Sequence, residues 1–381
     1  MLASEAGERW AIAGTGAIAS VATGARTLFE ALCAGRAGLA RLRGFDASRF
    51  RAMSAYEIDD RPATGDIPGR ATRWLCEAIA EAVRDAGVGE DLAGVPVLIG
   101  TGLRELRSAE LRWTDSVEFP LSRLHFGPAL RERFGAATTY TVTNACSASL
   151  YMLGMGADLI ASGAADVVVV AGADSITTSM FGLMDRVQGP GVDRVRPFDR
   201  HRRGALMGEG AAAVVLRRDG PARSWLRAVS LNCDAYNDTA PDQGRISEAI
   251  TEAHARAGIE PADVDVVLAH GTGTQLNDAA EAVVLAKIFG RDGDRPLVTG
   301  TKSMIGHTSG ASGLMNVVVA TEVLASGRIP PVVDASDVAD EAPGLRLVTM
   351  SEARADVALA QVQAFGFGGV NAVAILERAE R

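Results

Sequence analysis

Cys146 stands in a part of the sequence that suits a nucleophile. The stretch TVTNACSASLYMLGMGAD (141–158) begins with β-branched residues, which predict a buried strand, and continues with small residues, which predict a tightly packed helix. The cysteine would lie at the N-terminus of that helix, where free N–H groups and the helix dipole favour the thiolate. A lone cysteine among Ala and Ser is more often a small buried hydrophobe. The choice depends on whether other residues supply the groups that a nucleophile needs.

Three further stretches carry residue types that could complete such a site. LAHGTGTQLNDAAEA places His270 after a buried strand, with Asp278 and Glu281 on the helix that follows. TGTKSMIGHTSGASG holds Lys302 and His307, and this lysine is one of only two among 38 basic residues, which indicates a need for an ammonium. QAFGFGGVNAVAILE is a turn whose backbone could closely approach a reacting atom, because it contains Gly366, Gly368 and Gly369.

Two internal repeats indicate which elements hold these stretches. EAIAEAVRDAGV (77–88) matches EAITEAHARAGI (248–259), and each is followed by a GTG turn at the same offset. The helix after Cys146 matches the helix after His307 through LIASG and VLASG. The chain is therefore expected to be one α/β body of two duplicated halves, residues 1–222 and 223–381. The apolar strands predict mainly parallel sheets that are covered on both faces.

Composition argues against several classes of protein. The 381 residues are 48% hydrophobic and 22% charged, as in a globular α/β enzyme. The net charge of −9 argues against nucleic-acid binding, which needs a basic surface. Four scattered cysteines without a CxxC pair argue against a disulfide framework and against a metal site. No stretch predicts a membrane span or a signal peptide, so we expect a cytoplasmic protein. As a separate expectation, the enzyme uses no metal and no cofactor of its own.

Taken in order, the motifs resemble those of a known family. VTNACSAS, HGTGT, KSMIGHTSGASG and FGFGGVN resemble the elongating β-ketoacyl-acyl carrier protein synthases (types I and II) of the thiolase superfamily. The resemblance covers almost the whole chain and includes RPFDRHRRGALMGEGAAAVVL. It implies the thiolase fold, an α/β body whose duplicated αβ halves form five layers, αβαβα. It also implies decarboxylative condensation of an acyl group with malonyl-acyl carrier protein, in fatty acid or polyketide biosynthesis.

The resemblance implies a role for each motif residue. Cys146 would carry the acyl group as a thioester, and the backbone N–H groups of Cys146 and Phe367 would form the oxyanion hole. His270 and His307 would donate hydrogen bonds to the enolate that decarboxylation leaves, with Lys302 bonded near the second histidine. Phe367 would also act as a gate for the extender unit. Structural support would come from Asp278, Glu281, Asn316, Gly366, Gly368 and Gly369.

The partner that the resemblance implies is an acidic acyl carrier protein, which holds the substrate on its phosphopantetheine. An acidic enzyme needs a local basic patch to bind such a partner. The candidate docking residues are Arg70, Arg73, Arg200, Arg202 and Arg203. We also expect a homodimer whose interface uses the apolar strands TYTVT and VVVVAG, with a heterodimer containing a ketosynthase-like subunit as the alternative.

Two departures from the family pattern favour a specialised pathway such as polyketide biosynthesis. Segment 101–134 is about twenty residues shorter than the family pattern, in a region expected to shape the dimer interface and the acyl pocket. Asn316 replaces a Glu that would pair with the motif lysine, so we expect Lys302 either to be more mobile or to find another acid. Glu281 is the first candidate and Asp278 the second. Two other functions stay open, namely acyl transfer without decarboxylation and a non-catalytic chain-length partner.

Overall fold

The computed structural model describes residues 8–63, 65–290, 296–342 and 344–380. Its main strands lie side by side in the order β13-β11-β10-β15-β16-β9-β1-β8-β7-β5-β6. They are β1 (Trp10–Ala19), β5 (Val97–Thr101), β6 (Thr139–Thr143), β7 (Val167–Asp174), β8 (Gly210–Arg217), β9 (Ser224–Cys233), β10 (Val266–Leu268), β11 (Leu297–Thr299), β13 (Arg346–Leu347), β15 (Leu359–Gly366) and β16 (Val370–Arg378). Short strands are β2 (Ala22–Thr23), β3 (Ala40–Arg41), β4 (Ser54–Ala55), β12 (Arg328–Ile329) and β14 (Ala353–Arg354).

Ten α-helices are found among the described residues. They are α1 (Ala25–Cys33), α2 (Arg70–Asp85), α3 (Leu106–Thr114), α4 (Gly127–Phe134), α5 (Ala148–Ala161), α6 (Thr178–Val187), α7 (Gln243–Ala257), α8 (Gln275–Phe289), α9 (Lys302–Ile305) and α10 (Ser312–Ser326). The predicted short segment 101–134 contains α3 and α4, with a 3-10 turn at Leu121–Leu124 between them. Its shortness relative to the family pattern stays a prediction.

The order of strands repeats in the two halves of the chain. The first half reads β6-β5-β7-β8-β1 and the second β11-β10-β15-β16-β9, and each is the order 3-2-4-5-1 when the strands of that half are numbered along the chain. Helices α2 and α7, which carry the first sequence repeat, occupy equivalent places after β1 and β9. The duplicated αβ halves are therefore confirmed. The boundary at 222 lies in the connection from β8 to β9, while residues 1–7 and 381 lie outside the described residues.

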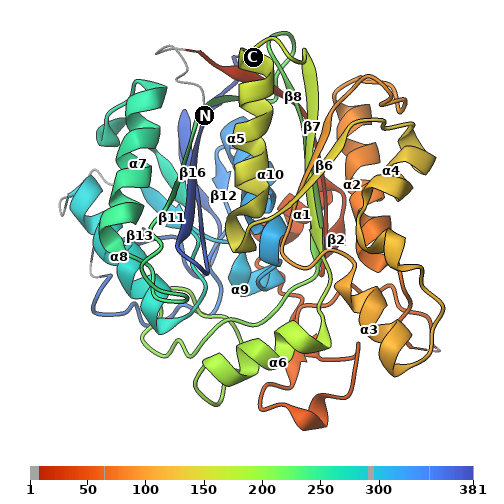
Figure 1. Ribbon diagram of the computed structural model, residues 1–381. Helices are drawn as coiled ribbons and strands as arrows, with labels where there is room; N and C mark the ends of the chain where they lie inside the picture. Colours follow the sequence, from red (N-terminus) through yellow and green to blue (C-terminus); the bar gives the residue numbers. More distant parts are fainter. Residues whose placement is uncertain (1–7, 64, 291–295, 343, 381) are drawn as a thin grey trace.

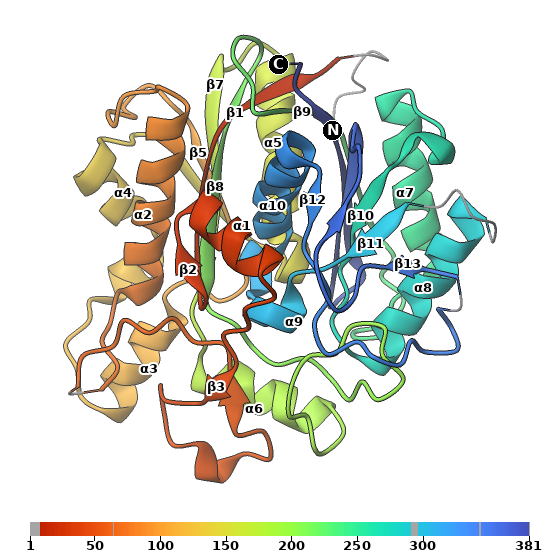
Figure 2. The ribbon, with the colours of Figure 1, turned by 180° about the vertical axis from the view of Figure 1, so that it is seen from behind.

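The halves stack as five layers, αβαβα (Figure 1). Helices α5 and α10 lie in the middle, with α2 and α4 outside one sheet region and α7 and α8 outside the other. A Cβ at Gly156 would lie 3.0 Å from Val170 of β7, and one at Gly154 would lie 3.2 Å from Leu231 of β9, so α5 touches strands of both halves. Seen from behind, α1 packs beside α10 (Figure 2).

The sheet is mixed, so the expectation of mainly parallel strands is wrong. Strand β5 runs parallel to β6 and β7, but β1 is antiparallel to both β8 and β9, and β16 is antiparallel to β15 and β9. The periodicity of buried strands reports burial and carries no information on direction. When the main strands of each half are numbered along the chain, every antiparallel pair between them includes a first or a fifth strand.

We find no membrane-spanning helix in the part of the chain that the structure describes, because no helix there is long and apolar enough to cross a bilayer. The cytoplasmic location expected from the sequence is not tested by this finding. It stays a prediction.

Candidate active site

The backbone around Cys146 turns sharply between strand β6 and helix α5. Ala145 has φ +47°, and the 3-10 turn Ala145–Ser147 leads directly into the helix. The second half repeats this turn 164 residues later, where Ser309 has φ +48° and Ser309–Ala311 leads into α10. The position equivalent to Cys146 is Gly310. The duplication therefore places a nucleophile in one half and a glycine in the other.

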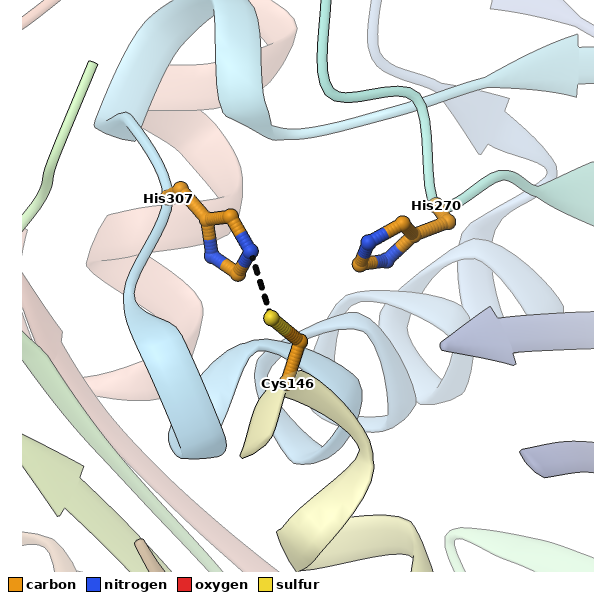
Figure 3. Close-up of side chains that lie close together, drawn as sticks. All are labelled: Cys146, His270 and His307. Atoms are coloured by element: carbon orange, nitrogen blue, oxygen red, sulfur yellow. Dashed lines mark hydrogen bonds between the residues drawn. The ribbon is translucent and has the colours of Figure 1, made fainter. Parts of the chain in front are cut away.

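Three of the predicted residues meet at this turn. Nε2 of His307 lies 3.0 Å from Sγ of Cys146, and the ring centroids of His270 and His307 are 5.5 Å apart. Figure 3 shows the two imidazoles on either side of the sulfur, all three side chains pointing into one space. Their donor atoms lie within 4.8 Å of one another, so they are also close enough to share a metal ion. The two halves of the chain thus supply one site.

Hydrogen bonds fix the tautomer of His307. The backbone N–H of Ser309 donates to Nδ1 at 3.1 Å, so Nδ1 carries the lone pair. The hydroxyl of Ser312 is 3.0 Å from the same nitrogen and serves as a second donor there. Burial lowers the pKa of His307 well below its usual value, and the nearby Lys302 charge adds to this. The neutral ring therefore carries its proton on Nε2, the nitrogen that faces Cys146.

His270 is held in the same tautomer by a different group. Nζ of Lys302 lies 3.4 Å from Nδ1 of His270 and donates to its backbone oxygen at 2.5 Å. An ammonium has only donors, so Nδ1 of His270 must accept. The pKa of His270 is also lowered well below its usual value, mainly by burial and next by Lys302. Both imidazoles therefore present an Nε2–H to the space around Sγ.

Among the described residues, the ammonium of Lys302 has neutral hydrogen-bond partners only. Its bonds go to His270, the first histidine, rather than to the second as expected. No carboxylate of the described residues lies within 4.0 Å of Nζ, so the predicted replacement acids, Glu281 and Asp278, are wrong. Burial lowers the pKa of Lys302 to about 8, although the Glu281 charge raises it from a distance.

Asn316 joins the segments on either side of this lysine. Its Oδ1 accepts from the hydroxyl of Thr301 at 2.9 Å, and its Nδ2 donates to the backbone oxygen of Ala269 at 3.3 Å. These are the residues directly before Lys302 and His270. Asn316 therefore ties the two loops together but supplies no charge.

The two acids instead hold the loop that carries His270. Glu281 accepts the backbone N–H groups of His270 and Gly271 at 2.7 and 2.8 Å. Asp278 accepts those of Thr272 and Phe198 at 2.9 and 2.8 Å. Burial raises the pKa of Glu281 to about 7. These contacts fit the orienting role expected of both acids.

The thiol of Cys146 is not activated in the way that its place before a helix predicts. Burial raises its pKa from 9.0 to about 11, which outweighs the opposing effects of the Lys302 charge and of the backbone N–H groups of Phe367 and Cys146. The expected thiolate is therefore wrong for the enzyme without substrate. The same two N–H groups are those predicted to form the oxyanion hole, and both act on Sγ.

The loop Gly366–Gly369 lies against the turn that carries Cys146. A Cβ at Gly366 would lie 2.7 Å from Cγ2 of Val370 and 3.1 Å from the nitrogen of Cys146, so any larger residue there would push these neighbours aside. A second loop holds the far end, because Gly368 N–H donates to the oxygen of Asp238 and the N–H of Asp234 donates to Gly369, both at 2.9 Å. The sequence analysis missed the second loop, since its bonds are made by the backbone.

Phe367 is one of the residues that line a cavity of about 420 Å³. Its side chain is 39% exposed, which is high for a phenylalanine. The other walls include Val187 of α6, Leu276 at the start of α8, and Arg203. Phe367 therefore belongs to both features, because it lines the cavity and its backbone N–H acts on the sulfur of Cys146.

Comparison with known proteins identifies the family. Residues 8–222 match the model for the β-ketoacyl synthase N-terminal domain, and residues 224–336 match the model for the β-ketoacyl synthase C-terminal domain. The chain belongs to the β-ketoacyl synthase family. It is 31% identical to the tetracenomycin polyketide synthase ketoacyl synthase alpha subunit of Streptomyces glaucescens, over 97% of each chain. It is 28% identical to the chloroplastic 3-oxoacyl-[acyl-carrier-protein] synthase I of Hordeum vulgare, over 97% of this chain and 88% of the relative.

Solved structures of ketosynthases agree with this assignment. The ishigamide ketosynthase/chain length factor superimposes with a TM-score of 0.87 and 30% identity, over 98% of this chain and all of the other. A type II polyketide synthase acyl carrier protein in complex with its ketosynthase matches with a TM-score of 0.84 at 17% identity, which shows the fold alone. The thiolase fold, the family and the ketosynthase class of enzyme, all predicted from the motifs, are confirmed.

Two of the five predicted docking arginines of the ketosynthase are buried, so their prediction is wrong. Arg70 is 2% exposed and is bonded to Asp60 and Glu209. Arg202 is 6% exposed and donates to backbone oxygens, including that of Thr274. The local sequence could not reveal this, because Glu209 is 139 residues from Arg70.

The other three arginines reach the surface in different settings. Arg73 pairs with Asp60, and Arg200 pairs with both Asp337 and Asp340. Arg203 is exposed, lines the same cavity as Phe367 and has no carboxylate within 4.0 Å among the described residues. Of the five predicted docking residues, Arg203 is therefore the exposed one whose charge has no carboxylate partner in the described part of the chain.

Asp174 is a supporting residue of the ketosynthase site that the sequence analysis missed. It is fully buried at the end of β7 and accepts the backbone N–H groups of Gly102, Leu103 and Gly310 at 2.9, 2.7 and 2.8 Å. Burial raises its pKa to about 6. The signal was a carboxylate directly after the buried run VVVVAGA. Asp174 fixes the turn equivalent to that of Cys146.

Proposed function

We propose that this ketosynthase loads an acyl group onto Cys146 and condenses it with malonyl-acyl carrier protein, giving a β-ketoacyl-acyl carrier protein. The observation that carries the proposal is the pair of Nε2–H groups, from His270 and His307, that face the space beside Sγ. Two neutral donors stabilise an enolate oxygen. Simple acyl transfer forms no enolate and needs no such pair, which disfavours the alternative without decarboxylation.

The first half-reaction is a thioester exchange. Sγ of Cys146 bonds to the acyl carbonyl carbon, the bond to the phosphopantetheine sulfur breaks, and the thiol proton leaves with that sulfur. The N–H groups of Cys146 and Phe367 would bind the oxyanion of the tetrahedral intermediate. Since burial favours the thiol of Cys146, these donors have to stabilise charge as it develops in the transition state.

The second half-reaction consumes malonyl-acyl carrier protein. The bond from the malonyl carboxylate to Cα breaks and releases CO₂, and its electron pair forms the enolate of the thioester. His270 and His307 would donate to the enolate oxygen. The enolate carbon then attacks the acyl-Cys146 carbonyl, the C–S bond breaks, and the sulfur leaves as a thiolate that takes up one proton from solvent. No step requires a metal or a cofactor of the enzyme.

The carrier protein would dock around the cavity mouth at Phe367. Exposed apolar side chains of Val187 and Leu276 line this cavity together with Arg203, which has no carboxylate within 4.0 Å among the described residues. An apolar surface with a positive rim suits an acidic helical partner. This surface replaces the docking patch expected from the sequence. It supports phosphopantetheine entry past Phe367, which would be the gate.

A dimer would use the free edge of β6. This strand ends the sheet, and Tyr140 there is 47% exposed. The other strand expected at the interface, VVVVAG, lies in β7 between β5 and β8, so that part of the prediction is wrong. We propose a homodimer through β6. The ishigamide ketosynthase/chain length factor makes a heterodimer with a ketosynthase-like subunit the alternative.

Polyketide biosynthesis is the pathway class that we propose, rather than fatty acid synthesis. The Streptomyces polyketide relative is 31% identical, above the 28% of the chloroplast synthase. The retention of Cys146 argues against a non-catalytic chain-length partner.

Intact protein mass tests the proposed function. Incubation with acyl thioesters should add one acyl group to the enzyme, and subsequent malonyl-acyl carrier protein should remove it with release of CO₂ and formation of a β-ketoacyl carrier. Transfer of the acyl group to an alcohol or amine without CO₂ would instead support the simple acyltransferase.

A further inference from the structure

The site of the ketosynthase contains the donors of a zinc site. Sγ of Cys146 and imidazole nitrogens of His270 and His307 lie within 4.8 Å of one another, and we call these three the donor cluster. Thiolate and imidazole are preferred zinc ligands, and three protein ligands with an open position are typical of reactive zinc centres. A zinc ion bound there would block the nucleophile and both hydrogen-bond donors.

We propose that Lys302 has a second role, which is to keep zinc-class cations off the donor cluster. The proposal goes beyond the condensation reaction and holds whichever acyl group the enzyme carries. It rests on the partners of the two Nδ1 atoms and on the placement of one positive charge.

The first argument concerns His270. An imidazole that binds a metal through Nε2 carries its proton on Nδ1 and donates it to an acceptor, usually a carboxylate or a carbonyl. Here Nδ1 of His270 faces Nζ of Lys302 at 3.4 Å, and an ammonium cannot accept. Coordination through Nε2 would place two donors face to face. Lys302 therefore holds His270 in the tautomer that cannot bind the metal.

His307 is held in the same way by its own loop. The backbone N–H of Ser309 points at Nδ1 from 3.1 Å, so the proton has to stay on Nε2. Metal coordination through Nε2 would require Ser309 to move. This second constraint is made by the backbone and survives any change of side chain at position 302.

The charge of Lys302 is uncompensated at short range. It lies directly beside the donor cluster, because Nζ is 3.4 Å from Nδ1 of His270 and the ring centroids of His270 and His307 are 5.5 Å apart. No carboxylate of the described residues is within 4.0 Å of Nζ, and Asn316 in the adjacent helix is neutral. A divalent cation in the donor cluster would therefore meet a buried positive charge in a medium of low dielectric constant.

Lys302→Gln tests the proposal, because glutamine is neutral and its carbonyl oxygen can accept from Nδ1–H of His270. The probes are Zn²⁺ alone, read as protection of the Cys146 peptide from alkylation by mass spectrometry, and Co²⁺ alone, read as thiolate-to-cobalt absorption at pH 7. We expect an apparent Kd for Zn²⁺ about 10- to 100-fold lower than in the unaltered enzyme. Lys302→Arg keeps the charge and the donors and should behave like the unaltered enzyme.

The double variant Cys146→Ala/Lys302→Gln should lose the gain in zinc affinity. This loss would assign the zinc binding to the donor cluster rather than to exposed Cys233 or surface acids. Equal zinc affinity in the unaltered enzyme and in Lys302→Gln would overturn the proposal. If circular dichroism shows that Lys302→Gln is unfolded, cobalt binding by the unaltered enzyme tests the proposal instead. A cobalt–thiolate band at micromolar Co²⁺ that vanishes in Cys146→Ala contradicts the proposal, and its absence supports it.

Discussion

The backbone N–H of Ser309 donates to Nδ1 of His307 at 3.1 Å, and this contact determines which nitrogen of the histidine carries the proton. The proton is placed on Nε2, 3.0 Å from the sulfur of Cys146. His307 is then a hydrogen-bond donor to the reacting groups, and it is not available as a base for the thiol. Lys302 gives His270 the same tautomer through a side chain instead of the backbone.

Cys146→Ala should abolish acyl loading and leave the fold intact, because replacing the thiol by hydrogen is a small change in a tight turn. Intact mass after incubation with an acyl thioester measures loading. Cys233→Ala, which changes an exposed cysteine, is the matched control and should load normally. A mass gain that persists in Cys146→Ala would show that another residue is the nucleophile.

Asn316→Glu should shift the alkaline limb of the pH–rate profile for malonyl decarboxylation to higher pH. In the unaltered enzyme the pKa of Lys302 is about 8, so its ammonium is lost as pH rises through that value and decarboxylation should slow. A carboxylate at 316 favours the ammonium and raises this pKa. Rates measured between pH 7 and 10 check the shift. An unchanged limb would mean that Lys302 does not control it.

The free energy of unfolding should depend on pH through Lys302. The pKa of Lys302 is about 8 in the folded enzyme and 10.5 in the unfolded chain, so the unfolded state binds more protons between these values. The contribution of Lys302 to the free energy of unfolding therefore rises with pH across this window. In Asn316→Glu this rise with pH should be smaller, because the carboxylate brings the pKa of Lys302 in the folded enzyme closer to that in the unfolded chain. Urea unfolding at pH 7.5 and pH 9.5 of both proteins measures the difference.

The sequence identified the residues of the site but not their protonation. Cys146, His270 and His307 follow strands or turns of two matching halves, so their convergence could be predicted from the motifs. The tautomers could not, because the backbone of Ser309 decides one of them. The pKa of Cys146 was predicted in the wrong direction because the cost of burial exceeds the effect of the helix N-terminus.

Surface predictions were less reliable than those for the core, for a physical reason. The motif FDRHRRG contains Arg200, Arg202 and Arg203, which the sequence treats alike. The fold buries Arg202 and pairs Arg200 with two aspartates far along the chain, while Arg203 has no carboxylate partner where the structure describes the chain. Only tertiary contacts distinguish the three.

Arg203→Glu should lower kcat/KM for carrier-bound substrates by about tenfold through weaker steering at the cavity mouth. Small thioesters, which need no docking, should be used at an unchanged rate. Arg131→Glu on α4 makes the same charge change at another exposed arginine and is the control. Equal losses with both kinds of substrate would mean that Arg203 has a structural role.

Gly369→Ala should destabilise the loop at Phe367 more than Gly368→Ala does. Both glycines have positive φ, +76° and +81°, so alanine is strained by about 1–3 kcal/mol at either position. Only at 369 would the Cβ also clash, 1.8 Å from Oδ1 of Asp234, whereas at 368 the space is open. The free energy of unfolding in urea compares the two variants, and equal losses would show that Asp234 simply moves aside.

The central claim is that His270 and His307 serve the enolate rather than the thiol. The most direct test measures the two half-reactions separately in His307→Ala, with His201→Ala at an exposed histidine as control. We expect malonyl decarboxylation to fall about 100- to 1000-fold, the usual effect of removing one such donor, while acyl loading onto Cys146 falls far less. Losses of equal size in loading and decarboxylation would contradict the claim, because they would make His307 a base for Cys146.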